Sequence, residues 1–351
     1  MSFSHYDNPF LSPLLGDKEI ADLFSPEADI KTMLQFEQGL VFVQAEFGLI
    51  PQAAAKAIDK AFETFEPQFE GLIEGVKRDG LMVPELVKQL RGHIGEKFGK
   101  YVHLGATSQD VIDSSLMVRT AQAFKILIDR TEKTLKSYEA LINQFGKNRL
   151  IARTRMQRAL PITVQDRIRS WAYNLEIARD KIVGCKLPVQ FGGPVGTLKE
   201  FGDNAIAMRT LLGVRLGIGA PNGNWHNARG PVVSVAEACS YITGTLGKLG
   251  IDVCLMAQNE LGEVTLSSGG GSSAMAHKQN PVKAEALVTL ARFNATLISG
   301  MHQSMVHEQE RSGAAWTLEW MLLPQMIVAA GAATRIANEL LSSITAMGTA
   351  P

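Results

Sequence analysis

The 351-residue sequence predicts an all-α fold built around a long helical bundle. Three observations support this prediction. Two stretches carry apolar residues at alternating spacings of three and four for much longer than an ordinary globular helix requires. Strand patterns are almost absent, and the composition, 46% hydrophobic with 35 basic and 35 acidic residues, excludes a disordered chain. Because one chain has difficulty covering such long rods, we expect the bundle to be a homo-oligomer.

The first long helix is expected from Ser108 to Phe145. It has a heptad seam that can pack against other helices over its whole length. This seam runs through Met117, Ala121, Phe124, Ile128, Thr131, Leu135, Tyr138, Ile142 and Phe145. A second seam is entered through Pro231, a residue favoured in the first turn of a helix. It comprises Val235, Cys239, Ile242, Leu246, Leu249, Val253 and Met256. A third long helix is expected to begin at Pro281, with Asn280 as its N-cap.

Shorter helices and a division into two domains complete the expected organisation. Apolar spacing predicts the shorter helices at residues 29–47, 51–63, 83–98 and 162–183. We expect residues 1–105 to form an N-terminal helical domain and residues 106–351 to form the central long-helix bundle domain. The longest apolar stretch without charge, Trp320 to Thr334, is shorter than the roughly 20 residues that a membrane span needs. We therefore expect a buried helix there and no membrane partner.

Composition also limits the compartment and the partners. Residues 1–17 lack the basic start and apolar run of a secretory signal, so we expect a cytoplasmic protein. Cys185, Cys239 and Cys254 are too few and too widely spaced for a disulfide framework. Zero net charge argues against a nucleic-acid partner held by counterion release. The histidines have no metal-ligand spacing and no phosphate loop appears, so we expect neither a metal nor a cofactor.

Zero net charge conceals one strongly basic segment between Lys147 and Arg169. Seven basic residues there accompany a single acid, Asp166, which gives a local charge of +6. A solvated surface is the ordinary interpretation of such a run. The alternative is a binding site, because the planar guanidinium group binds a carboxylate through two parallel hydrogen bonds. A small polyanion fits this pattern better than a long nucleic acid does.

Residues 101–110, YVHLGATSQD, form a polar segment just before the first long helix. Thr107 or Ser108 together with Asp110 is an ordinary N-cap pattern. Hydroxyl groups at a helix start can also hold an anion, so these residues are candidates for substrate binding as well as for capping.

Residues 267–280, SSGGGSSAMAHKQN, lie between two helices that carry seams. Three consecutive glycines permit backbone motions that other residues do not, so the loop can close over a ligand. Lys278 and Asn280 approach the start of the next helix, where free N–H groups and the helix dipole favour an anion. A flexible surface linker is the alternative interpretation of this segment.

Three dispersed motifs resemble the signature regions of the fumarase/aspartase superfamily. They are YVHLGATSQD at 101–110, RTRMQRALPIT at 153–163 and GGSSAMAHKQNP at 270–281. Within the superfamily, FGGPVGTL at 191–198, NWHNARGPV at 224–232 and HEQERSGAAWTLEW at 307–320 are similar to the 3-carboxymuconate cycloisomerase branch. The resemblance implies a homotetramer of long central bundles whose sites combine segments from three subunits. It also implies that no metal or organic cofactor takes part.

The reaction implied by this resemblance is that of an intramolecular lyase. A carboxylate oxygen of the tricarboxylate 3-carboxy-cis,cis-muconate adds to a conjugated double bond and gives 4-carboxymuconolactone. This step belongs to protocatechuate catabolism through the β-ketoadipate pathway. An argininosuccinate- or adenylosuccinate-type lyase that releases fumarate is one alternative, and a non-catalytic oligomeric scaffold is the other.

Site residues follow from the matching motif positions. Ser273 corresponds to the serine that exchanges a proton with the carbanion, and Ser272 is the alternative for this role. His103 is the candidate for the remaining polar role or for a structural hydrogen bond. The expected substrate-binding donors are Thr107, Ser108, Gln157, Lys278, Asn280 and Arg311. Arg155 stands where the family commonly has histidine and can bind and polarise a carboxylate but hardly act as a base. Ala276 replaces a usual proline. The sequence stops at Pro351, so we expect either that the family's C-terminal helical domain is absent or that the sequence is a piece of a longer chain.

Overall fold

The computed structural model describes residues 7–267, 269–271, 274–275 and 278–351. Its long helices are α3 (Pro26–Glu46), α8 (Ser108–Phe145), α9 (Val164–Val183), α11 (Gly230–Met256), α12 (Val282–Gln303) and α13 (Ala314–Ser342). The shorter helices are α1 (Ser12–Leu15), α2 (Lys18–Asp22), α4 (Gln52–Phe62), α5 (Phe69–Asp79), α6 (Val83–Ile94), α7 (Glu96–Gly99), the 3₁₀ turn η1 (Lys199–Asn204) and α10 (Ala205–Leu216). Two antiparallel pairs complete the fold: β1 (Arg149–Thr154) with β2 (Gln157–Thr163), and β3 (Val264–Leu266) with β4 (Ile344–Met347).

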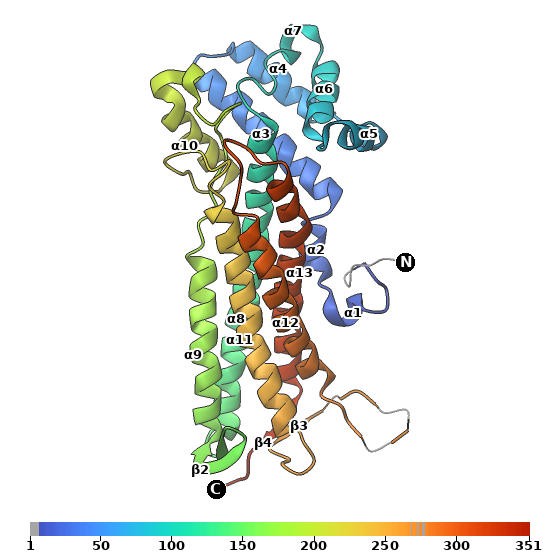
Figure 1. Ribbon diagram of the computed structural model, residues 1–351, viewed down its shortest axis with the longest axis vertical. Coiled ribbons are helices and arrows are strands. Elements are labelled where there is room, and N and C mark those ends of the chain that lie inside the picture. Colours follow the sequence, from blue (N-terminus) through green and yellow to red (C-terminus); the bar gives the residue numbers. More distant parts are fainter. Residues whose placement is uncertain (1–6, 268, 272–273, 276–277) are drawn as a thin grey trace.

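Five helices lie side by side in one long bundle: α8, α9, α11, α12 and α13 (Figure 1). Helices α3 to α7 and α10 gather at the upper end in this view, where α8 begins, whereas the β1–β2 hairpin and the β3–β4 pair lie at the lower end. The 38 residues of α8 span about 57 Å at 1.5 Å per residue. The predicted all-α long bundle is therefore confirmed, and α8 has the predicted bounds.

The seams explain why these rods pack. All seven seam residues of α11 are buried, and the α8 seam alternates between buried and half-buried positions. Two glycines bring α11 close to α12: an added Cβ at Gly250 would lie 2.5 Å from the carbonyl oxygen of Ala284, and one at Gly247 would lie 2.5 Å from the Cβ of Ala291. The two helices can therefore approach at a distance that larger side chains would prevent.

Helix α13 is strongly apolar and contains the predicted buried stretch. By length and composition it could cross a membrane, but 67% of its most apolar 18-residue stretch is buried inside the protein. Residues 326–334 are all buried, so the prediction of a core helix is confirmed.

Several boundaries differ from the sequence prediction. The helix expected at 83–98 is interrupted at Gly95, whose φ of +86° is incompatible with a continuous helix. The helix expected from residue 162 begins at Val164, because the preceding residues pair in β2 and Thr163 caps the helix with Asp166. Asn280 is not the N-cap of α12: that position is held by Pro281, and Asn280 pairs through its backbone with Gly270.

The buried apolar residues that the structure describes form two clusters. One runs along the bundle, and the other lies at the upper end under helices α3, α4 and α6. The upper cluster also includes residues far along the chain, among them Val189, Phe191, Met208 and Leu212. The division at residue 105 remains a prediction, since the upper cluster draws on residues from both sides of it.

Candidate active site

Asp110 joins three sequence motifs at the upper end of the bundle. Its carboxylate is fully buried and accepts hydrogen bonds from the backbone N–H groups of Thr107 (3.0 Å), Gly192 (2.8 Å) and Gly193 (2.9 Å). His226 Nε2 lies 2.8 Å from the same carboxylate. The first signature motif and two of the cycloisomerase-type motifs thus meet on one side chain.

A buried charge network lies one turn further along α8. Arg229 contacts Asp113 at 2.7 Å and Glu319 at 2.6 Å, and all three side chains are fully buried. Trp316 donates its indole N–H to Asp113 at 2.9 Å, so the motif at 307–320 joins the same network. Burial alone would lower the pKa of Arg229, but the two carboxylates outweigh it and raise the pKa above its ordinary value. Arg229 therefore stays charged.

Four of the predicted site residues gather next to Asp110. Thr107 and Ser108 are half-buried at the start of α8, and the Thr107 N–H bonded to Asp110 confirms the predicted capping. Arg311 donates to Gln109 Oε1 at 3.1 Å and to the carbonyl of Pro194 at 3.1 Å, which places its guanidinium beside the helix start. His103 lies in the preceding turn, with Nδ1 2.5 Å from Glu37 Oε1.

Arg155 and Gln157 lie at the opposite end of the bundle. Both are exposed in the β1–β2 hairpin, and Arg155 has a φ of +49° in its tight turn. Arg155 lines an open cavity of about 830 Å³ together with Arg153, Arg167 and Lys248. Part of the basic segment therefore forms a strand hairpin. A solvated helix or loop surface is the ordinary interpretation of such a run, and the structure has two strands there instead.

The loop before α12 holds the remaining predicted residues. Lys278 is exposed, and Asn280 closes the base of the loop through two backbone hydrogen bonds of 2.8 Å with Gly270. Ser272 and Ser273 lie outside the described residues. Within one chain, the predicted residues consequently form three separate groups, and the length of α8 separates Thr107 from Gln157.

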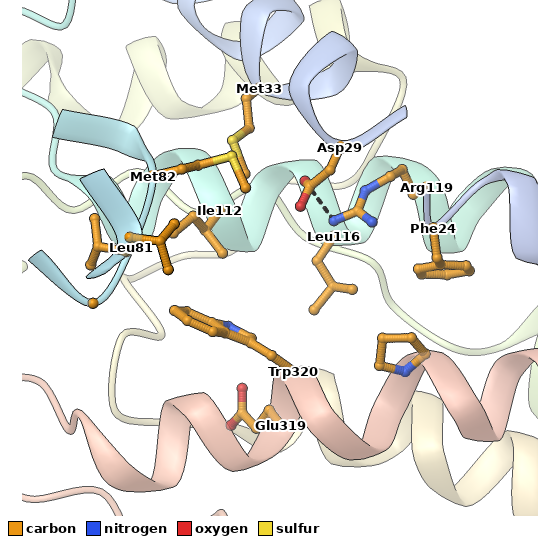
Figure 2. Close-up of a pocket in the computed structure, with 13 residues that line it drawn as sticks. Phe24, Asp29, Met33, Leu81, Met82, Ile112, Leu116, Arg119, Glu319 and Trp320 are labelled. Carbon is orange, nitrogen blue, oxygen red and sulfur yellow. Dashed lines mark ion pairs between the residues drawn. The ribbon is translucent and has the colours of Figure 1, made fainter. Parts of the chain in front are cut away.

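A second cavity, of about 300 Å³, lies beside the charge network between α3, α8 and α13 (Figure 2). Asp29 and Arg119 form an ion pair of 2.7 Å on one wall, and Glu319 and Trp320 come from α13 on the opposite wall. The other lining residues are mainly apolar. No predicted site residue of the described chain lines this cavity, so we do not place the reaction there.

The structure reveals polar residues that the sequence patterns had not identified as a site. They are Glu37, Asp113, His226, Arg229 and Glu319. The motifs that contain His226, Arg229 and Glu319 served only as markers of a resemblance, because the partners of these residues lie between 90 and 116 residues away in the chain. Among the described residues, no three His, Cys, Asp or Glu side chains come together as a metal site requires.

The long helical bundle and its charged upper end can be compared with known proteins. Residues 25–295 match the lyase family, and the chain belongs to this family, as the resemblance to the fumarase/aspartase superfamily predicted. Its relatives include the 3-carboxy-cis,cis-muconate cycloisomerase of Acinetobacter baylyi, which is 33% identical over 339 residues, covering 93% of this chain and 75% of the relative. The predicted assignment to an enzyme family is thus confirmed.

Solved structures show the same fold. The 3-carboxy-cis,cis-muconate lactonizing enzyme from Pseudomonas putida has a TM-score of 0.88 and 29% identity, covering 97% of this chain and 77% of that chain. A fumarate lyase from Mesorhizobium sp. BNC1 has a TM-score of 0.88 and 30% identity, covering 95% of this chain and 76% of that chain. The bundle is therefore of the fumarase/aspartase type.

Proposed function

We propose that the chain is a cycloisomerase that interconverts 3-carboxy-cis,cis-muconate and 4-carboxymuconolactone. The observation that carries the proposal is the meeting of the first signature with three cycloisomerase-type motifs around Asp110 and Asp113. Relatives with this activity, at about one third identity over most of the chain, support it. We place the reaction in the cytoplasm, in protocatechuate catabolism through the β-ketoadipate pathway.

The chemistry is an addition with no leaving group. A carboxylate oxygen forms a C–O bond to one carbon of a conjugated double bond, and the electron pair moves to the neighbouring carbon, which then takes up a proton. An adjacent carboxylate stabilises the carbanion as its aci-form, so negative charge accumulates there in the transition state. Preorganised cationic and N–H donors at that carboxylate accelerate the reaction because they bind the transition state more strongly than the substrate.

The roles of the side chains follow from their charge and position. Ser273, with Ser272 as the substitute, exchanges the proton, and His103 is the second proton-transfer group. Arg155 binds and polarises a carboxylate without acting as a base. The donors to the three carboxylates are Thr107, Ser108, Gln157, Lys278, Asn280 and Arg311. The substrate is accordingly a small tricarboxylate.

We further propose a homotetramer with sites shared between subunits. Antiparallel packing of bundles would bring the upper end of one chain to the lower end of another, and so join residue groups that one chain keeps apart. The outer surface of the bundle supports this arrangement, because Tyr173 and Val183 on α9 are 65% and 62% exposed. A rod with such exposed apolar side chains is suited to association along its length.

A spectrophotometric assay with enzymically prepared 3-carboxymuconate tests the function. We expect loss of the diene absorbance at micromolar enzyme, with formation of the lactone. No absorbance loss would reject the proposal. Fumarate release from argininosuccinate or adenylosuccinate would instead favour an elimination of that type, and inactivity on all three compounds would favour a non-catalytic scaffold.

A further inference from the structure

Glu37 of α3 contacts the candidate proton-transfer residue from inside the protein. Its side chain is only 1% exposed, and it is neighboured in α3 by the core residue Phe36. Glu37 Oε1 lies 2.5 Å from His103 Nδ1, and the other carboxylate oxygen is buried without a hydrogen-bond partner among the described residues. A carboxylate removed from water in this way needs a nearby cation, because burying an isolated charge is strongly unfavourable.

The backbone of His103 is held in an unfavourable conformation. Its φ of +60° lies in the left-handed region, which is unfavourable for a residue with a β-carbon. Helix α3 holds the same turn a second time, because Gln44 Nε2 donates to the carbonyl of Leu104 at 2.6 Å. One contact from α3 is thus charged and the other is neutral, although both support one turn. A conformation of this kind persists at sites where the side chain has to occupy a particular place.

Three charged groups surround the His103 ring. Glu37 from α3 and Asp110 from α8 favour the imidazolium, whereas Arg91 from α6 opposes it. Burial alone would lower the pKa of His103, but the two carboxylates outweigh both burial and Arg91, so the pKa lies above its ordinary value. The protonated ring is therefore the form that the surroundings favour.

We propose that Glu37 is the positioning residue for His103: it holds Nδ1 and the positive charge, and leaves Nε2 as the nitrogen that delivers the proton. This inference rests on the proposed function. In the lactonising direction the Nε2–H proton replaces the one that Ser273 gives to the carbanion carbon, so an N–H bond breaks, a C–H bond forms, and a neutral imidazole remains. The ring then regains its proton from solvent, and Glu37 stays ionised throughout.

Glu37→Gln and Gln44→Met, made in the full chain, separate positioning from structural support. Glu37→Gln keeps a polar group of the same size but removes the charge, so we expect the basic limb of the kcat/KM profile to move to lower pH by about one unit or more. At a pH above both midpoints this lowers the rate by about ten-fold or more. Gln44→Met loosens the same turn without changing its charge, and we expect a lower Tm with an unmoved pH midpoint.

NMR titration of the His103 ring supplies a measurement that does not depend on turnover. His103→Asn, a residue that tolerates positive φ, assigns the resonance. We expect the pKa of His103 to fall in Glu37→Gln and to stay in Gln44→Met. The inference would be overturned if Glu37→Gln left both the His103 pKa and the pH profile unchanged, or if both variants shifted them equally. The proposed function would still stand.

Two further outcomes are decisive. A fall in the His103 pKa in Glu37→Gln, combined with a wild type that does not consume 3-carboxymuconate, would overturn proton delivery together with the proposed function. If Glu37→Gln does not fold, the NMR titration of the wild type decides. A His103 pKa below the ordinary value for histidine would overturn the inference.

Discussion

At the scale of single residues, Asp110 does more than cap a helix. Both α8 and α9 begin with a threonine followed three residues later by an aspartate, so the sequence gives Asp110 and Asp166 the same capping role. Only Asp110 is buried, and only Asp110 also accepts N–H groups from a distant loop. The capping could be predicted from the local pattern, but the second role could not, because Gly192 lies 82 residues away.

Asp110→Asn is expected to destabilise the protein by about 2–4 kcal/mol, because an amide NH₂ would replace an acceptor oxygen among buried N–H donors and remove the charge facing His226. Urea denaturation followed by circular dichroism measures the change. Asp166→Asn is the matched control, since it alters the same capping position in an exposed helix start. A similar loss in both variants would contradict the role assigned to Asp110.

At the scale of helices and strands, periodicity predicted the long rods well because their packing repeats along the chain. The bounds of α8 and the buried seam of α11 follow directly from apolar spacing. The hairpin at 149–163 was missed, because its residues are mostly exposed and lack the alternation that marks a half-buried strand. Glycines at the α11–α12 contact also carry information that apolar periodicity does not contain.

Gly250→Ala is expected to destabilise the protein, although alanine normally stabilises a helix relative to glycine by about 1 kcal/mol. The added Cβ would lie 2.5 Å from a backbone carbonyl of α12, which cannot move independently of its helix. Gly244→Ala on the same helix is the matched control, because nothing lies within 4 Å of its added Cβ. We expect a lower Tm for the first variant and an equal or higher Tm for the second. Equal increases would show that the helices do not pack closely there.

At the scale of the whole molecule, the motifs identified the candidate site residues but did not show which of them lie together. Arg311 and Lys278 belong to groups at different ends of the bundle, and nothing in a single sequence shows which surfaces meet between chains. The exposed apolar side chains on α9 indicate association without giving its geometry.

Complementation tests the sharing of sites between subunits. We expect Arg311→Ala and Lys278→Ala each to lower kcat/KM by about 10²-fold or more, because each removes a charged donor from the transition state. When the two inactive proteins are unfolded together and refolded as a mixture, activity should return, since some sites then receive both wild-type residues. Each variant refolded alone is the control. A mixture as inactive as its components would indicate that both residues belong to one chain's site.

The Asp110 carboxylate also links two motions that would otherwise be independent. The N–H groups of Thr107, Gly192 and Gly193 share one acceptor, so segment 190–193 cannot lift away without exposing the first turn of α8. These amides therefore belong to one cooperative opening unit, and their hydrogen exchange is governed by a common free energy. Segment 190–193 is consequently as stable as the helix start on which it rests.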